Sequence, residues 1–546
     1  MQADLTIIWS IVVIYFIILI VLGVWSRKAI VSPEDYHIAG RKVGAFINGS
    51  AYMAGYLSIA SFLGLPAYIF ILGMPFDWAL LGIASAMPFG AALVAAQLRK
   101  AAPVSTADYF AWRYETDVYG RVVLTVTYLW GSILYVVLCL VGMGLALVAT
   151  LRVHYLIALT IATVIMLIYL WLGGMVATTI TSAFQSWVML VSAWAIVIGM
   201  FIAAGGPAQL FAMSKEMQPY FFISGAHNPV YVKALNKPWN FSPDWVFATG
   251  IISVFLWYSV WNWGGIVMPY AVVRIFTTFD RKTARWTLFW APVFVWIFYV
   301  ALTIIGIGCR PVCEVFGPHP HIAEGTEINP GLPTLGIFIY YLKTYGIGSV
   351  VDYATIAVAE AVRNPWILGL AIAGILSIGM ATIASWAMIS ATILARDWPH
   401  FILKKPLPPK KEILWARIIM VILVVVSMFI AIAPPAMVLD LSGAAFLVIT
   451  AVVGPPLFTG IWWKRGGPKA FKIYTTFMLA ISTFSWLFSY FVWRRPHVFF
   501  LFPYLGTPHQ IYWVYVGFVI WIILCLVTKP SSPETIKKYC EDLHTP

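Results

Sequence analysis

Runs of about 20 apolar residues follow one another along the whole chain, with short polar segments between them. A run of this length crosses the hydrocarbon core of a bilayer as one helix. Of the 546 residues 62% are hydrophobic and only 10% are charged, whereas a soluble domain carries about 25% charged residues. Too few charges remain to cover a water-exposed surface, which excludes a cytosolic enzyme, a nucleic-acid binder and a disordered scaffold. We predict an all-α, polytopic membrane protein.

The apolar runs predict about thirteen membrane-spanning helices, bounded by charged residues, proline or glycine. Their expected limits, numbered here as spans 1 to 13, are 5–25, 44–73, 77–98, 121–149, 154–174, 184–204, 245–272, 286–308, 364–394, 413–433, 437–461, 470–492 and 510–528. We expect no soluble domain between them.

Lysine and arginine are divided unevenly between the two sides of these spans. With successive loops on opposite sides, 25 of the 34 basic residues fall on one side and nine on the other. The richer side is expected to be cytoplasmic, so the net charge of +13 orients the chain and does not indicate a nucleic-acid partner. An odd number of spans then leaves the N-terminus outside and the C-terminus inside. Arg27 and Lys28 follow the first run, which we interpret as a retained helix and not a signal peptide.

The segments between the spans differ in character. We expect an amphipathic inner segment at 100–120, longer outer loops at 205–244 and 309–363, and an interfacial helix at 331–348, which is too short to span. The tail 529–546 is polar and is expected to be cytoplasmic and mobile.

Two cysteines and two histidines lie close together in the second outer loop, in CRPVCEVFGPHPH: Cys309, Cys313, His319 and His321. Their spacing matches no standard metal pattern, so we predict no metal beyond a coupling cation. A disulfide between the two cysteines remains open, since this face is oxidising.

Span 2 has the features of a helix that is broken inside the membrane. The run GSAYMAGYLSIASFLGLPAYIFILG gathers small, polar and proline residues at mid-membrane depth: Gly55, Ser58, Ser61, Gly64 and Pro66. Because proline lacks an amide hydrogen and clashes with the preceding turn, Pro66 should free the carbonyl near position 62. Unwound backbone is tolerated there only where it lines a cavity or is buried in protein. Simple packing is the alternative, because glycine and proline are common in membrane helices.

Span 7 repeats this combination, since Ser259 and Asn262 precede Gly264, Gly265 and Pro269. Span 2 enters from the inside and span 7 from the outside, as an inverted repeat of spans 2–6 and 7–11 requires. Broken helices at matching positions in two halves are the best sequence pointer to the site of a secondary transporter. The predicted hinge residues are Gly55, Gly64, Pro66, Gly264, Gly265 and Pro269.

Five longer motifs occur in a fixed order: GRKVGAFINGSAYMAGYLSIASFLGLPAYIF (40–70), VSTADYFAWRY (104–114), YLWLGGMVATTITSAFQSWVML (169–190), WGGIVMPYAVVRIFTTFDRKTAR (263–285) and FTGIWWKRGGPKA (458–470). Together they resemble the sodium:solute symporter family, over about residues 5–530. The motifs SxASFLG and GGMVATT are most similar to the cation/acetate branch, although Tyr270 stands where that branch usually has histidine.

This resemblance implies a LeuT-type fold, with two inverted five-helix repeats that work by alternating access. The expected organisation is an extra helix and inner loop at 1–43, the first repeat at 44–204, the outer loop 205–244, the second repeat at 245–461, two further helices at 462–528 and the tail. No organic cofactor is implied.

The resemblance also implies a sodium site made of carbonyls on span 2 and a carbonyl with two hydroxyls on span 9. The positions carried over are Ala54, Leu57, Ile378, Ala381 and Thr382, and Ser385 is a further candidate. One hydroxyl position is Ala381, and Ser182 replaces an acidic residue that often follows the glycine motif. Sodium is still the expected coupling ion, because the broken-helix geometry of the site is retained. Protons remain an alternative.

Polar and aromatic residues on spans 2, 4 and 7 are the substrate candidates: Tyr56, Ser58, Ser61, Tyr128, Ser132, Trp257, Ser259, Asn262 and Trp263. We find no lysine or arginine at membrane depth to pair with a carboxylate, so helix N-termini, amides and hydroxyls would have to hold it.

Charged residues near the span ends have simpler interpretations. We expect Asp77 and Asp440 to lie at solvated outer ends, with a gating role as the alternative. Arg274, Asp280 and Arg285 suggest either an ion-paired clamp on the inner face or positive-inside anchoring.

We therefore predict a plasma-membrane symporter, not an enzyme, that imports a small monocarboxylate such as acetate together with a cation. The alternatives are a symporter of the same family for an amino acid or sugar, and a transporter-like solute sensor. The expected partners are the solute, the cation and the lipid bilayer, with no nucleic acid; the sequence leaves protein partners unknown.

Overall fold

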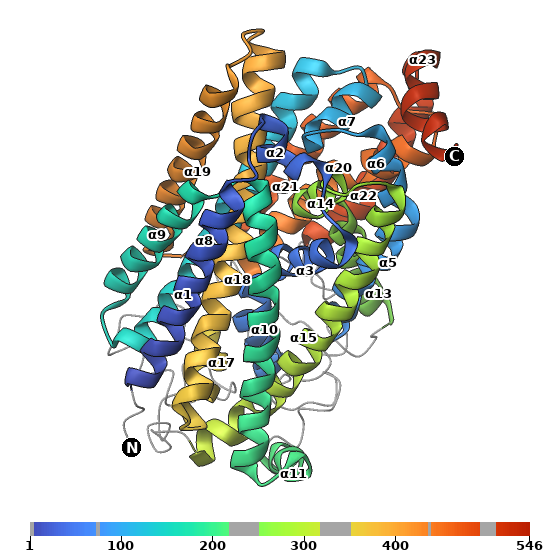
Figure 1. Ribbon diagram of the computed structural model, residues 1–546. Coiled ribbons are helices and arrows are strands. Elements are labelled where there is room, and N and C mark those ends of the chain that lie inside the picture. Colours follow the sequence, from blue (N-terminus) through green and yellow to red (C-terminus); the bar gives the residue numbers. More distant parts are fainter. Residues whose placement is uncertain are drawn as a thin grey trace.

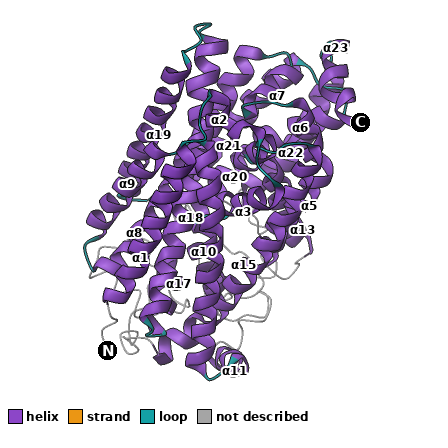
Figure 2. Cartoon of the chain, in the orientation of Figure 1, coloured by secondary structure: helices purple, strands orange, loops and turns teal. Residues whose placement is uncertain are grey.

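The computed structural model describes residues 5–72, 77–217, 251–316, 351–434, 438–491 and 509–545 (Figures 1 and 2). Helices make up most of these ranges, and the only β-type pairing within them is one isolated bridge between Val43 and Thr278. Eight of the described helices are long and apolar enough to cross a membrane, and two shorter apolar helices accompany them. The predicted all-α, polytopic class is thus confirmed, whereas the count of thirteen spans and the orientation stay predictions.

The first half of the chain contains α1 (Leu5–Arg27), α2 (Pro33–Ile38), α3 (Ala45–Tyr56), α4 (Leu65–Leu72), α5 (Asp77–Gly90), α6 (Ala96–Ala101), α7 (Thr106–Arg113), α8 (Asp117–Leu151), α9 (Tyr155–Leu172), α10 (Met175–Ala204) and α11 (Pro207–Met217). Helix α5 continues into α6 through a π-helical turn at Ala91–Ala95.

The second half contains α13 (Ile251–Val267), α14 (Pro269–Phe276), α15 (Arg281–Phe316), α17 (Ala354–Ala361), α18 (Pro365–Thr392), α19 (Pro409–Ala431), α20 (Val438–Trp462), α21 (Pro468–Phe491), α22 (His509–Val527) and α23 (Pro533–Ile536). Helix α18 continues through the π-helical segment Ile393–Ile402. The interfacial helix expected at 331–348 lies outside the described residues.

Helix α15 is longer than predicted, which changes the interpretation of the two cysteines in the expected outer loop. Cys309 and Cys313 lie inside this helix, one turn apart, and both are buried and not joined in a disulfide. The disulfide alternative is therefore wrong in this structure, because both side chains pack within the helical core. His319 and His321 lie outside the described residues, and the described part contains no cluster of metal-ligating side chains.

Two groups of helices form the body of the molecule. The central group consists of α3–α4, α5–α6, α13–α14 and α15, which pack against one another. The scaffold group consists of α8, α9, α18 and α19. Helix α10 joins them by packing against both α3 and α18, while α20 packs on α8 and α13 (Figure 1).

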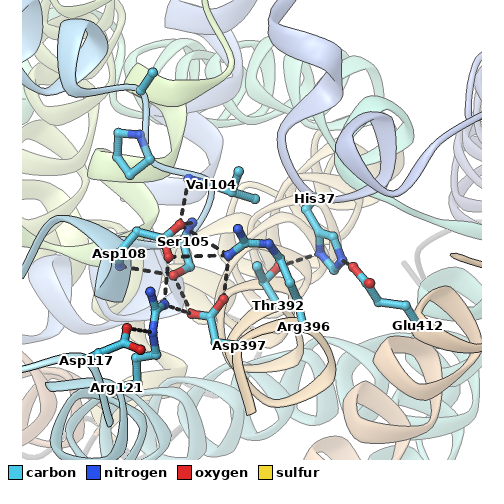
Figure 3. Close-up of polar contacts among 12 residues, drawn as sticks. His37, Val104, Ser105, Asp108, Asp117, Arg121, Thr392, Arg396, Asp397 and Glu412 are labelled. Carbon is cyan, nitrogen blue, oxygen red and sulfur yellow. Dashed lines mark hydrogen bonds and ion pairs between the residues drawn. The ribbon is translucent and has the colours of Figure 1, made fainter. Parts of the chain in front are cut away.

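The scaffold group is held at one end by a buried ion-pair network (Figure 3). Arg121 on α8 lies with its Nη1 2.6 Å from Asp108 Oδ1 and 3.3 Å from Asp397 Oδ2, and all three side chains are fully buried. Arg396 binds both carboxylates, at 3.2 Å and 2.5 Å. Ser105 Oγ donates a hydrogen bond to Asp397 at 2.5 Å.

Asp108 also begins α7, since it forms a capping box with Ser105. Burial opposes ionisation of this carboxyl, but Arg396, Arg121 and the Ser105 amide outweigh that effect and lower the pKa of Asp108. Two carboxylates facing two guanidiniums therefore tie α7, α8 and the end of α18 together. The segment predicted as a surface-lying loop at 100–120 is thus anchored in the protein interior.

Replacing Arg121 by Met should destabilise the protein by about 3–5 kcal/mol, because Asp108 and Asp397 lose a buried partner. The matched control is Asp117→Asn, which removes only the 56% exposed partner of the same arginine and should cost less than about 1 kcal/mol. Thermal unfolding in detergent measures both variants. Equal shifts for the two would contradict this account of the network.

Candidate transport site

The first helix interruption lies between α3 and α4. Helix α3 ends at Tyr56, and Leu57 is extended with φ −69° and ψ 139°. The chain resumes helical geometry through the π-helical turn Ala60–Gly64 before α4 begins. The Phe62 carbonyl, which Pro66 should free, accepts a hydrogen bond from Thr355 Oγ1 at 2.8 Å. A second helix, α17, thus satisfies the backbone group that the proline leaves without a partner.

The second interruption lies between α13 and α14, at Met268. This residue is extended with φ −61° and ψ 136°, and Pro269 is the first residue of α14. Of the three predicted hinge residues, Pro269 lies at the break, because proline forces the residue before it out of the helical region. Gly264 and Gly265 lie within α13, about one turn earlier.

The two glycines of α13 instead allow close packing. A Cβ atom on Gly264 would overlap the ring of Phe446 on α20. A Cβ atom on Gly265 would lie 2.5 Å from Ala86 Cβ on α5 and 3.1 Å from the Tyr56 hydroxyl. Helix α13 therefore approaches its neighbours as closely as its backbone permits.

The predicted cation residues come together where α3 ends against α18. Thr382 Oγ1 donates a hydrogen bond to the Leu57 carbonyl at 2.7 Å, and both residues are fully buried. Ser385 Oγ donates to the Ala381 carbonyl at 2.9 Å. A Cβ atom on Gly55 would lie 2.9 Å from Ser385 Oγ, so this hydroxyl also faces α3.

The remaining predicted cation positions lie on the same two helices. Ala54 is one turn before Leu57, Ile378 is one turn before Thr382, and both are buried. Ser182, which replaces the expected acidic residue, is buried on α10, and its Oγ has no hydrogen-bond partner within the described ranges.

A small cavity with a volume of about 30 Å³ lies beside the first interruption. Its lining comes from both interrupted helices and from α8, α15 and α20: Tyr56, Ser58, Ala60, Ser61, Leu65, Tyr135, Trp261, Tyr270, Tyr299, Ser442 and Phe446. Tyr56, Ser58 and Ser61 are sequence candidates that do line it. Hydroxyl groups and aromatic rings dominate this lining, and none of these described residues is charged.

The candidates on α13 lie elsewhere. Ser259 hydrogen-bonds the hydroxyl of Tyr515 on α22. Asn262 Nδ2 donates to Ser85 Oγ on α5 at 2.7 Å, and the ring of Trp263 lies against Phe458 and Phe518. Trp261 faces the cavity instead, because successive residues of a helix point about 100° apart. The side chain of Trp257 lies outside the described residues.

The two candidates on α8 also lie outside the cavity lining. Ser132 Oγ lies 3.1 Å from the Trp386 carbonyl and 2.8 Å from Ser390 Oγ, so it joins α8 to α18. Tyr128, about one turn before Ser132 on α8, is also buried. Tyr135, three residues after Ser132, lines the cavity, and its ring stacks on Trp386 at 4.3 Å between centroids.

Sequence reasoning missed five aromatic lining residues: Tyr135, Trp261, Tyr270, Tyr299 and Phe446. Tyr270 had a signal, since it departs from the resembled branch directly after Pro269. Its ring lies 5.8 Å from that of Tyr56, so the two interrupted helices touch at the cavity.

The charged residues near the inner end of span 7 do not form a clamp with one another. Arg274 Nη1 lies 2.6 Å from Thr179 Oγ1 on α10, and Arg285 is exposed. Asp280 Oδ1 accepts the Thr283 amide at 2.7 Å, which lowers the pKa of Asp280. Of the two alternatives, the ion-paired clamp is therefore wrong. The side chains of Asp77 and Asp440 lie outside the described residues.

A family model described as the sodium:solute symporter family matches residues 36–469, well over half of the chain. This chain belongs to the sodium:solute symporter family. It is therefore a multi-pass membrane protein of a transporter family, with a small solute and a cation as partners. The family consists of transporters and not of enzymes. Sodium is the coupling ion that the family indicates.

The structure is similar to a substrate-bound, outward-open Na⁺-coupled sialic acid symporter, with a TM-score of 0.72 and 17% identity over 96% of this chain and 98% of that chain. A mutant manganese transporter from Eremococcus coleocola matches with a TM-score of 0.48 and 14% identity, over 91% and 95% of the two chains. Mhp1, a nucleobase-cation-symport-1 family transporter, matches with a TM-score of 0.48 and 13% identity, over 94% and 99%. The first similarity shows a shared transporter fold over nearly the full length of both chains.

Replacing Gly264 by Ala should destabilise the protein by about 1–3 kcal/mol, because the new methyl group overlaps Phe446. The matched control is Gly443→Ala on α20, where a Cβ atom meets nothing within 4 Å. That change should be neutral or slightly stabilising. Thermal unfolding tests both, and a neutral Gly264→Ala variant would show that α13 has room to move away.

Proposed function

We propose that this protein imports a small monocarboxylate, such as acetate, across the plasma membrane together with sodium by alternating access. Family membership supplies sodium-coupled solute transport. The observation that supports the finer statement is the cavity lined by hydroxyls and aromatic rings, directly beside the contact between Leu57 and Thr382.

The lining of the cavity favours a small solute with at most one charge. The cavity volume of about 30 Å³ is far below the range of about 300–1,000 Å³ for small-molecule sites, so the cavity must widen when a solute enters. The helix that restarts after Ser58 has its first turn beside the cavity, where Ser58, Ala60 and Ser61 lie. Such an N-terminus stabilises one carboxylate, and the rings of Tyr56 and Trp261 surround the apolar part of the solute.

Sodium would bind between α3 and α18. The Leu57 carbonyl and Thr382 Oγ1 are 2.7 Å apart, and the hydroxyl hydrogen now joins them. When sodium binds, Thr382 turns this hydrogen away and offers a lone pair, because a hydroxyl is both donor and acceptor. Ala54 and Ile378 supply further carbonyls, and Ser385 replaces the hydroxyl that position 381 lacks.

One peptide group would couple the two sites. The Leu57 carbonyl faces Thr382, while the next residue, Ser58, lines the cavity. Because a peptide unit is planar, sodium that orients this carbonyl also orients the Ser58 amide on the opposite edge. Bound sodium thus prepares the solute site, and a bound carboxylate favours the same peptide orientation.

Purified protein in liposomes should accumulate labelled acetate when a sodium gradient is imposed at constant pH. Propionate should compete, whereas amino acids and sugars should not. Accumulation driven only by a pH gradient would support proton coupling, and uptake of an amino acid or sugar would support another solute. No uptake of any short acid under either gradient would contradict the proposal, and solute binding without uptake would favour a sensor.

Thr382→Ala should weaken the apparent affinity for sodium by roughly tenfold or more, since losing one oxygen ligand removes about 1.4 kcal/mol or more. The matched control is Thr163→Ala, a buried threonine on α9 whose hydroxyl binds only the Leu159 carbonyl of its own helix. Sodium titration of uptake at constant acetate measures both. An unchanged sodium dependence in Thr382→Ala would remove this residue from the site.

A further inference from the structure

The polar tail expected to be mobile is folded onto the lysine- and arginine-rich end of the molecule (Figure 1). We call residues 533–545 the C-terminal strap. It consists of α23, the π-helical turn Lys537–Glu541 and the short helix Asp542–His544. Cys540 and Leu543 are buried, with exposed fractions of 3% and 2%. The prediction of a mobile tail is wrong, because these two apolar side chains find a binding surface.

One side of the strap binds α7, the helix that the ion-pair network ties to the scaffold group. Tyr109 donates its hydroxyl hydrogen to the Tyr539 carbonyl at 3.2 Å. The ring of Tyr539 stacks on Trp112 with centroids 5.6 Å apart. Just before the strap, Ser532 donates its amide and hydroxyl hydrogens to Glu115, at 2.8 Å and 2.5 Å.

The strap also binds the end of α20. His544 Nε2 lies 2.9 Å from the Ile461 carbonyl, and its ring lies 4.3 Å from that of Trp462. Glu541 and Lys464 form an exposed ion pair at 2.5 Å. Helix α7 packs against α8, and α20 packs more extensively on α8 than on α13, so this part of the strap lies on the scaffold side.

The last residue of the strap binds the central group. The Thr545 carbonyl accepts hydrogen bonds from Lys100 Nζ at 2.9 Å and from Arg281 Nη1 at 3.0 Å. Lys100 belongs to α6 and Arg281 is the first residue of α15. Two basic side chains of the central group therefore converge on one carbonyl, next to the place where Asp542–His544 packs against α6.

We propose that the C-terminal strap is an intramolecular brake, which holds this end of the transporter closed and must release when the two helix groups separate. In alternating access one helix bundle rocks against the other around a central site. The strap bridges both groups, so an opening at this end stretches the contacts of Thr545 first, since they are exposed and few. This inference rests on the proposed transport function and adds a regulated step to it.

The double variant Lys100→Gln, Arg281→Gln removes both charged donors to Thr545 while leaving the strap residues intact. The matched control is Lys282→Gln, an exposed lysine beside Arg281. Cys540 is a built-in reporter, because its thiol is buried beneath the strap against the Ile461 carbonyl. In a background where the other four cysteines are replaced by alanine, maleimide modification of Cys540 should be about two- to fivefold faster in the double variant than in the control.

Hydrogen exchange and uptake complete the test. In the double variant, release should lower the protection of α6 and α14 amides against hydrogen exchange. The initial rate of sodium-driven acetate uptake should rise by about two- to fivefold, as for Cys540 modification. Neither quantity should change in Lys282→Gln. Unchanged Cys540 modification would overturn the proposal. Faster modification with unchanged exchange in α6 and α14 would also overturn it, since the strap would then be a passive appendage.

These readouts separate failure of the brake from failure of the proposed solute. Cysteine modification and hydrogen exchange require no transported solute. If both respond as expected but acetate is not taken up, the brake stands and the monocarboxylate assignment fails. If acetate is taken up normally and neither readout responds, the brake fails and the proposed function stands.

Discussion

Backbone groups inside a bilayer have no water to bind, and the structure of this protein follows from how it meets that constraint. Continuous helices satisfy the hydrogen bonds of their own backbone groups. The two interruptions, at Leu57 and at Met268, expose carbonyls that other helices must serve. Thr382 donates to the Leu57 carbonyl and Thr355 to the Phe62 carbonyl. In the proposed mechanism, sodium replaces the hydrogen bond between Thr382 and the Leu57 carbonyl. The atoms that satisfy the interrupted backbone are therefore also the atoms proposed to bind the ion.

Charge is used differently at the two depths of the molecule. The described residues around the cavity are uncharged, which suits a site that must bind and release a small solute. At the basic end, Asp108 and Asp397 face Arg121 and Arg396 in a fully paired network. Buried pairs of this kind resist separation, because a lone buried charge is costly. The exposed contacts of Thr545 are far weaker, so motion at this end is expected to begin at the strap.

Sequence reasoning succeeded where a residue acts through its own backbone. Pro269 marks the second interruption, because proline restricts the residue before it, and Pro66 leaves the Phe62 carbonyl for a neighbouring helix. Gly264 and Gly265 were also selected as hinge residues, but they lie within α13 and serve helix packing. Sequence reasoning also selected Ser259 and Asn262 for the cavity, where Trp261 lies instead. In a helix that is apolar on every side, no periodicity reveals which face meets which neighbour.

By itself, the sequence determined a helical membrane protein, its family resemblance, two interrupted helices and the residue types available for a cation. Each of these depends on local chemistry or on a motif read along the chain. Only the tertiary structure decided which side chains surround the cavity, that α15 extends through Cys309 and Cys313, and that the tail folds back as a strap. Those features depend on contacts between residues far apart in the chain, such as Lys100 with Thr545, and no local pattern encodes them.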